Sequence, residues 1–114
     1  ALPLTPDTQN LFDQQQFARM KPGAHFINVG RGELVNESAL INALNSQHLA
    51  GAALDVFATE PLPEDSPLWS MPNVIITPHS SGASKKSELR AEELFVSNFA
   101  LFVENKTMHN VVTI

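Results

Sequence analysis

An arginine, a glutamate and a histidine each stand in a polar stretch that follows a strand-like run of the sequence. Arg31 lies between two glycines, Glu60 lies in a proline-rich segment, and His79 follows a proline. The planar guanidinium of Arg31 can hold a carboxylate through two parallel hydrogen bonds. His79 can donate or accept a proton near neutral pH, and a neighbouring carboxylate such as Glu60 favours its protonated form. These residue types are what the reduction of a 2-keto acid by hydride requires.

Alternating strand-like and helix-like segments are expected to position these three residues. The strand-like segments are 1–4 (the end of a strand), 24–29, 52–57 and 73–77, and the helix-like segments are 9–20, 37–46 and 84–104. We expect Asp7 or Thr8 to cap the first helix and Asn36 to cap the second. This alternation is typical of βα units, and it predicts an α/β fold, namely a partial Rossmann-like parallel sheet with flanking helices and a long C-terminal helix. Because open α/β sheets bind ligands at the carboxyl ends of their strands, the three residues should meet at one edge.

Composition narrows the class of protein. The chain has 114 residues, a net charge of −5 and no cysteine, so disulfides, thiolate metal sites and a cysteine nucleophile are excluded. Its densest basic run is Lys85-Lys86, which predicts no nucleic-acid partner. No apolar run approaches the roughly 20 residues of a membrane span, so no membrane partner is predicted. The absence of cysteine fits a reducing compartment, and we expect a cytoplasmic location. The four histidines show no metal-ligand spacing, so no metal is predicted.

Four linked motifs carry a resemblance to a known family. They are Leu2–Thr8, Val29–Val35, Leu54–Pro63 and the segment Pro67–His79. In type, order and separation they resemble the motifs of the D-isomer-specific 2-hydroxyacid dehydrogenases, and among these the chain looks closest to the glyoxylate/hydroxypyruvate reductases. The resemblance spans essentially the whole chain.

The resemblance implies a nicotinamide-dependent oxidoreductase that acts on a small 2-keto or 2-hydroxy acid, with NAD or NADP as cofactor. It implies that Arg31 binds the substrate carboxylate, that His79 is the acid and base, and that Glu60 pairs with His79. It also implies that Asp55 lies near the nicotinamide carboxamide. The residues that would contact the cofactor are Leu2, Pro3, Val29, Gly30, Arg31, Asp55, His79, Ser80, Ser81 and Gly82. A homodimer is the oligomeric state that the resemblance implies.

One part of the family pattern is missing from this sequence. The chain has no Gly-x-Gly-x-x-Gly loop to hold a pyrophosphate, and in the family that loop lies upstream. We therefore interpret residues 1–114 as the C-terminal portion of a dinucleotide-binding domain. The tail, residues 105–114, would return to the substrate domain of an intact protein and pair or pack there.

Simpler interpretations compete at several positions. Asp55 could be a structural hydrogen-bonding residue, and His79 could merely cap the last helix. His25, His48 and His109 are expected at the surface, and the aromatic stripe of Phe95, Phe99 and Phe102 is expected in the core or in a dimer interface.

Two alternatives to an active enzyme also stay open. One is a non-catalytic regulatory protein on the same fold, like the corepressors that resemble these enzymes. The other is an inactive structural fragment, and the isolated 114-residue piece is predicted to show no hydride transfer.

Overall fold

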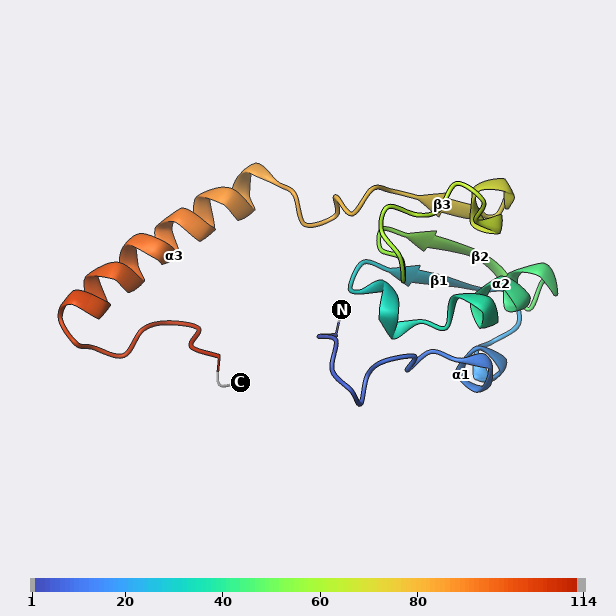
Figure 1. Ribbon diagram of the computed structural model, residues 1–114, viewed down its shortest axis with the longest axis horizontal. Helices are drawn as coiled ribbons and strands as arrows, with labels where there is room; N and C mark the ends of the chain where they lie inside the picture. Colours follow the sequence, from blue (N-terminus) through green and yellow to red (C-terminus); the bar gives the residue numbers. More distant parts are fainter. Residues whose placement is uncertain (1, 113–114) are drawn as a thin grey trace. The chain divides into compact units, whose positions relative to one another are not determined.

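Residues 2–112 are described by this computed structural model, and they divide into two units between Ser81 and Gly82. The first unit contains three strands, two α-helices and two short 3-10 helices (Figure 1): α1 Gln14–Arg19, β1 Ala24–Asn28, η1 Gly32–Leu34, α2 Glu37–Asn45, β2 Leu49–Leu54, η2 Pro67–Ser70 and β3 Val74–Ile76. The second unit contains one long helix, α3 Lys85–Val103.

The three strands form one parallel sheet in the order β1-β2-β3. Asn28 at the end of β1 pairs with Leu54 at the end of β2, which pairs with Ile76 at the end of β3. The strands therefore end together, and the segments that follow them leave from one edge of the sheet (Figure 1). This arrangement confirms the α/β fold and the parallel sheet that the sequence predicts.

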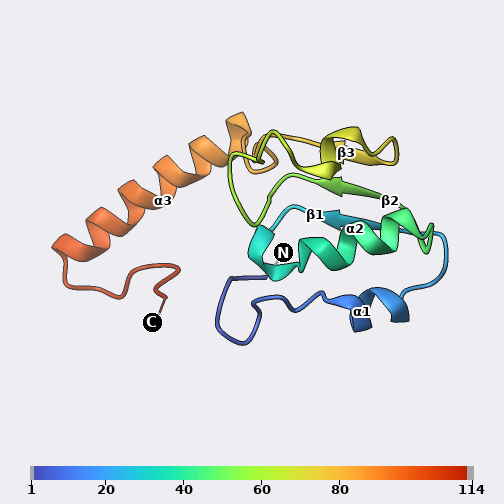
Figure 2. The same cartoon turned by 45° about the vertical axis from the view of Figure 1, so that its right-hand side comes forward.

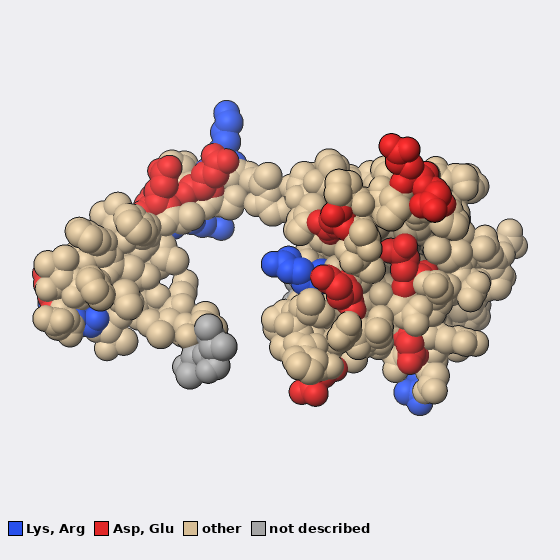
Figure 3. Space-filling view, in the orientation of Figure 1, with Lys and Arg blue, Asp and Glu red and all other residues tan. Residues whose placement is uncertain are grey.

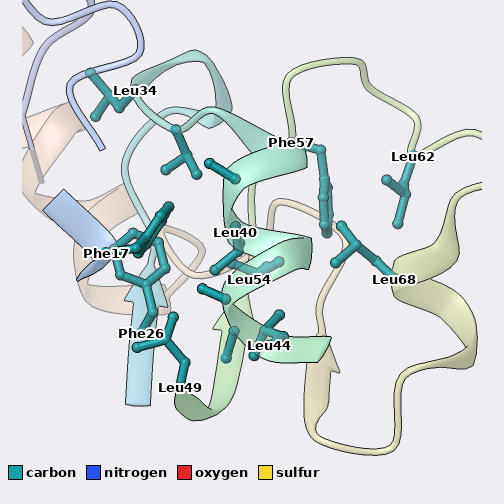
Figure 4. Packing of buried hydrophobic residues seen from close by; sticks show 14 residues of the cluster. Phe17, Phe26, Leu34, Leu40, Leu44, Leu49, Leu54, Phe57, Leu62 and Leu68 are labelled. Carbon is teal, nitrogen blue, oxygen red and sulfur yellow. The ribbon is translucent and has the colours of Figure 1, made fainter. Parts of the chain in front are cut away.

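The core lies between one face of the sheet and the helices of the first unit. α2 begins at Asn36, whose side chain accepts a hydrogen bond from the Ala39 amide at 3.1 Å, as predicted. α2 packs against α1 and β2, and the two helices run along the same side of the sheet (Figure 2). Figure 4 shows ten labelled members of the core, which are Phe17, Phe26, Leu34, Leu40, Leu44, Leu49, Leu54, Phe57, Leu62 and Leu68. Burial of this apolar face stabilises the sheet, and so it stabilises the positions of the strand ends.

The first helix is shorter than predicted, and the expected cap at Asp7 or Thr8 is wrong. Asp13 is the N-cap, because its carboxylate accepts hydrogen bonds from the Gln15 and Gln16 amides and Gln16 returns a bond to the Asp13 amide. The Thr8 hydroxyl instead donates to the Pro3 carbonyl at 2.8 Å and closes a turn. Residues 10–12 pair with residues 33–36, and this pairing keeps them out of the helix.

The strands also begin and end differently from the prediction. β2 covers Leu49–Leu54 rather than 52–57. It starts early because Leu49 already pairs with Ala24 of β1. Beyond Leu54, the Asp55 carbonyl accepts the amide of His79, which lies in a turn rather than in a strand. Residues 2–4 lie in no strand, so the predicted strand end at 1–4 is wrong for them, while Ala1 lies outside the described residues.

The second unit consists of α3 and a tail that folds back on it. The predicted helix 84–104 is confirmed as α3, and Ser84 is its N-cap, with its side chain accepting a hydrogen bond from the Ser87 amide. The Asn98 side chain accepts the His109 amide at 2.7 Å and donates to the His109 carbonyl at 3.1 Å. Among the described residues of α3 no side chain is buried, so the expectation that its aromatic stripe forms core is wrong for this unit. Val111 and Val112 are exposed, and the prediction that the tail packs on a substrate domain stays a prediction; Thr113 and Ile114 lie outside the described residues.

Of the three histidines outside the candidate site, two are exposed as predicted and one is not. His25 and His109 are exposed, but His48 is half-buried and its Nε2 lies 3.0 Å and 3.1 Å from the Phe17 and Met20 carbonyls, so it holds the end of α1.

On the face of the first unit seen in Figure 3, acidic side chains are spread more widely than basic ones. Across the described residues, no helix is long and apolar enough to span a membrane, and no group of three potential metal ligands occurs.

Candidate active site

Arg31 lies in a tight turn directly after β1. The Asn28 side chain spans this turn, since its Oδ1 accepts the Gly30 amide at 3.1 Å and its Nδ2 donates to the Arg31 carbonyl at 3.0 Å. The Arg31 side chain is exposed, and its Nη1 donates to the Gly30 carbonyl at 2.8 Å. Asn28 was not predicted from the sequence as part of the site. The available signal was a polar side chain at the end of a strand-like run, immediately before the glycine-rich turn.

Gly32 brings the arginine turn against the segment that follows β2. A Cβ atom at Gly32 would lie 1.9 Å from the Phe57 carbonyl carbon and 2.5 Å from the Ala58 nitrogen. Only glycine allows this approach without moving one backbone away from the other. The same segment carries Glu60, whose Oε1 accepts the Phe57 amide at 2.9 Å. Gly32 therefore sets the spacing between the Arg31 turn and the Glu60 loop.

The buried Asp55 organises the turn that carries His79. Its carboxylate accepts hydrogen bonds from the Ser80 and Ser81 amides, both at 2.9 Å, and from the Thr77 hydroxyl. Its backbone carbonyl accepts the His79 amide at 2.9 Å. His79 adopts a φ of +51°, a left-handed conformation that is uncommon outside glycine and must be held by its surroundings. The bonds to Asp55 supply that support.

Hydrogen bonds to Asp55 also hold its pKa far below the usual range for a carboxyl group. The Ser81 side chain is the largest cause, followed by the Thr77 hydroxyl, and these effects outweigh the burial that would raise the pKa. A carboxyl group whose pKa is lower in the folded than in the unfolded state stabilises the fold above its unfolded pKa. That stabilisation is lost as the pH falls through the folded pKa.

We expect Asp55→Asn to lower the free energy of unfolding, because an amide cannot accept all the donors that face the carboxylate. At about pH 7 the variant should lack the whole stabilisation that the charge gives wild type. At about pH 3 the difference in the free energy of unfolding should be smaller, because wild type itself begins to lose this stabilisation there. Urea unfolding at the two pH values measures this, and Asp65→Asn in the exposed loop is the matched control. A loss that is equal at both pH values would contradict the role of the charge.

Glu60 and His79 form a direct pair. The Nδ1 atom of His79 lies 2.7 Å from Oε2 of Glu60, and both side chains remain partly exposed. The hydrogen bond to His79 is the largest cause of a lowered pKa for Glu60, and the Phe57 amide adds to it. Glu60 is therefore charged at neutral pH and directs the other imidazole nitrogen, Nε2, away from itself.

Arg31, Glu60 and His79 line one small cavity of about 170 Å³, together with Gly32, Glu33, Phe57 and Ala58. The structure thus brings together the three residues that the sequence predicts at one edge of the sheet. A larger cavity of about 580 Å³ shares Phe57, Glu60 and His79 but is otherwise mostly apolar and lacks Arg31. The smaller cavity is the better candidate for an acidic substrate, because it alone of the two offers a cation beside the imidazole.

The predicted cofactor contacts are not equally exposed. Leu2, Pro3 and Val29 present exposed side chains, Gly30 and Asp55 are buried, and Ser80 and Ser81 are exposed beside His79. Gly82 begins the second unit, where its carbonyl accepts the Ser87 hydroxyl at 3.1 Å.

Comparison with known proteins identifies the family. The model described as "D-isomer specific 2-hydroxyacid dehydrogenase, NAD binding domain" matches residues 1–81. The chain belongs to this family. One similar dehydrogenase by sequence is glyoxylate/hydroxypyruvate reductase B of Citrobacter koseri, which is 47% identical over 111 residues, 97% of this chain and 34% of that protein.

Solved dehydrogenase structures agree with the fold. A D-isomer specific 2-hydroxyacid dehydrogenase from Xanthobacter autotrophicus Py2, in complex with NADPH and MES, matches with a TM-score of 0.91 and 45% identity over 98% of this chain and 36% of that one. The NADPH-dependent glyoxylate/hydroxypyruvate reductase of Sinorhizobium meliloti, in complex with NADP and sulfate, matches with a TM-score of 0.87 and 40% identity over 97% of this chain and 36% of that one. The chain spans about a third of the length of these relatives.

Proposed function

We propose that this chain supplies the substrate-binding and acid–base part of an NAD(P)-dependent D-2-hydroxyacid dehydrogenase that reduces a small 2-keto acid. The observation that carries the proposal is the single cavity lined by Arg31, Glu60 and His79, with Nδ1 of His79 bonded to Glu60. The relatives named glyoxylate/hydroxypyruvate reductase favour glyoxylate or hydroxypyruvate as the substrate. In the whole protein, residues 1–114 would be the C-terminal portion of the dinucleotide-binding domain, with 105–114 returning to the substrate domain.

The residues at the sheet edge fit the nicotinamide end of the cofactor. Val29 leaves β1 with an exposed apolar side chain, and exposed Leu2 and Pro3 offer further apolar surface in the first unit. The pyrophosphate needs a glycine-rich loop that this sequence does not contain. The contact of Asp55 with the nicotinamide carboxamide stays a prediction. In this chain the Asp55 carboxylate accepts its hydrogen bonds from the turn at 77–81.

The chemistry follows from the positions of the three side chains. The reduced nicotinamide would supply the hydride to the keto carbon. Arg31 would hold the substrate carboxylate through its two-pronged guanidinium, and Nε2 of His79 would deliver a proton to the carbonyl oxygen as the new C–H bond forms. Glu60 would hold Nδ1 and so orient the ring before the transfer. In the oxidative direction, neutral His79 would accept the proton of the hydroxyl group.

We expect Arg31→Ala to raise KM for the keto acid about ten- to a hundredfold, since it removes charge-assisted hydrogen bonds to the carboxylate. Arg31→Lys is the matched variant, because it keeps the charge and loses the planar fork, and it should recover only part of the loss. Steady-state kinetics of the whole protein with glyoxylate and hydroxypyruvate, and with both NADH and NADPH, measures this. An unchanged KM in Arg31→Ala would remove Arg31 from the proposed site.

The same assay separates the proposal from a regulatory protein on this fold. A whole protein that binds NADH or NADPH but turns over no keto acid, with His79→Ala behaving as wild type, would favour the regulatory alternative. The isolated chain is still predicted to show no hydride transfer. The homodimer also stays a prediction.

A further inference from the structure

Asn28 is one of two buried polar or charged side chains among the described residues, and the proposed chemistry uses neither of its amide atoms directly. Asn28 is the last residue of β1, and the residue as a whole is 8% exposed. A buried amide is costly unless both its donor and its acceptor are satisfied. The groups that satisfy this one therefore show what it holds in place.

Both amide atoms of Asn28 are bonded to the turn that carries Arg31. Oδ1 accepts the Gly30 amide at 3.1 Å, and Nδ2 donates to the Arg31 carbonyl at 3.0 Å. These bonds fix the backbone just before and just after the Arg31 side chain. The Asn28 carbonyl also accepts the Asp55 amide at 3.0 Å, which ties the turn to the residue that holds the His79 loop.

The Arg31 side chain has little else to direct it. Its Nη1 bonds to the carbonyl of its own turn at 2.8 Å, and within the described part of the chain no carboxylate forms a salt bridge with it. The direction in which the Arg31 side chain points from the turn therefore depends on the backbone of that turn. That backbone is held by Asn28 on one side and by the close approach of Gly32 to Phe57 on the other.

We propose that Asn28 is a positioning residue that aims Arg31 into the cavity by clamping both sides of its turn. This rests on the proposed function, in which Arg31 binds the substrate carboxylate. Asparagine suits the position because it offers one acceptor and one donor at the right places. Aspartate has the same shape and would keep the acceptor for Gly30, but it would place a charged oxygen against the Arg31 carbonyl.

The test is Asn28→Asp in the whole protein, with Asn73→Asp as the matched control. Asn73 donates to the Ala50 carbonyl at 3.3 Å near the opposite end of β2, so its replacement makes the same chemical change far from the Arg31 turn. We expect Asn28→Asp to raise KM for the keto acid about tenfold or more, with a smaller change in kcat, because a displaced clamp weakens binding of the carboxylate. Asn73→Asp should leave both constants within about twofold of wild type.

A double-mutant cycle separates positioning from a general structural role. In an Arg31→Ala background, Asn28→Asp should change KM less than about twofold, because the side chain it positions is already gone. Equal effects in both backgrounds, or an unchanged KM in Asn28→Asp, would overturn the proposal while leaving the role of Arg31 intact. An unchanged KM in Arg31→Ala would instead overturn the proposed function. Asn28→Ser is a second variant that introduces no charge. Thermal unfolding shows whether each variant folds. If neither Asn28 variant folds, Asn28 has a structural role and the proposal fails.

Discussion

Replacing His79 with glutamine is expected to lower kcat for reduction of the keto acid by about 10²- to 10⁴-fold. Glutamine can still donate a hydrogen bond, but it has no titratable proton to give to the carbonyl oxygen. Binding of NADH or NADPH should change much less than turnover, because His79 is only one of the expected cofactor contacts and the others remain. Steady-state kinetics for turnover and fluorescence titration for cofactor binding measure the two effects separately.

The controls for His79 use a remote histidine and its own partner. His25→Gln alters an exposed histidine near the start of β1 and should keep the wild-type kcat. Glu60→Gln keeps an acceptor for Nδ1 but removes the negative charge beside the ring, so kcat should fall, though by less than in His79→Gln. A His79→Gln protein that retains more than about a tenth of the wild-type kcat would show that another group supplies the proton.

Gly32→Ala is expected to destabilise the fold by about 3 kcal/mol, an effect at the upper end of those seen for overpacking. The added methyl group would overlap the backbone of Phe57, and a backbone cannot move aside as a flexible side chain can. Relief of the clash would separate the Arg31 turn from the loop that carries Glu60. We therefore expect kcat/KM to fall as well, even at temperatures where the variant is fully folded.

Gly82→Ala is the matched control for this prediction. No atom lies within 4 Å of the position that its Cβ would take, and its φ is not in the left-handed region. Its effect on the free energy of unfolding should be within about 0.5 kcal/mol. Urea unfolding monitored by the single tryptophan, Trp69, which lies in the first unit, gives the free energies. Equal stabilities for Gly32→Ala and wild type would show that the two backbones separate at no cost.

Local sequence patterns predicted which helices and strands form better than they predicted the residues at which these begin and end. The cap at Asn36 was predicted because it depends on a side chain and a backbone amide three residues away, and the last helix was predicted from its apolar stripe. The first helix was predicted too long because residues 10–12 have an apolar spacing that suits a helix, yet they pair with residues 33–36. That competing partner lies more than twenty residues away and leaves no mark on the local pattern.

The aromatic stripe of α3 shows a different limit. Phe95 and Phe99 stack with their ring centroids 6.4 Å apart, but both remain exposed within the described unit. Helical spacing shows that one face is apolar, and it does not say which surface covers that face. The expectation of core was therefore wrong here, while an interface stays a prediction.

The residues at the strand ends separate what sequence alone determined from what tertiary structure decided. The types and order of Arg31, Glu60 and His79, together with the alternation of strands and helices, were enough to predict the parallel sheet and the edge where these residues meet. The family was predicted from the resemblance of the four motifs. Sequence could not show that Asn28 clamps the arginine turn, that Gly32 touches the backbone of Phe57, or that Asp55 holds the His79 turn. Asp55 bonds to residues 22 to 26 positions away, and such contacts depend on the register of neighbouring strands. Register is set when the whole core packs, so the support of the site became visible only in the folded chain.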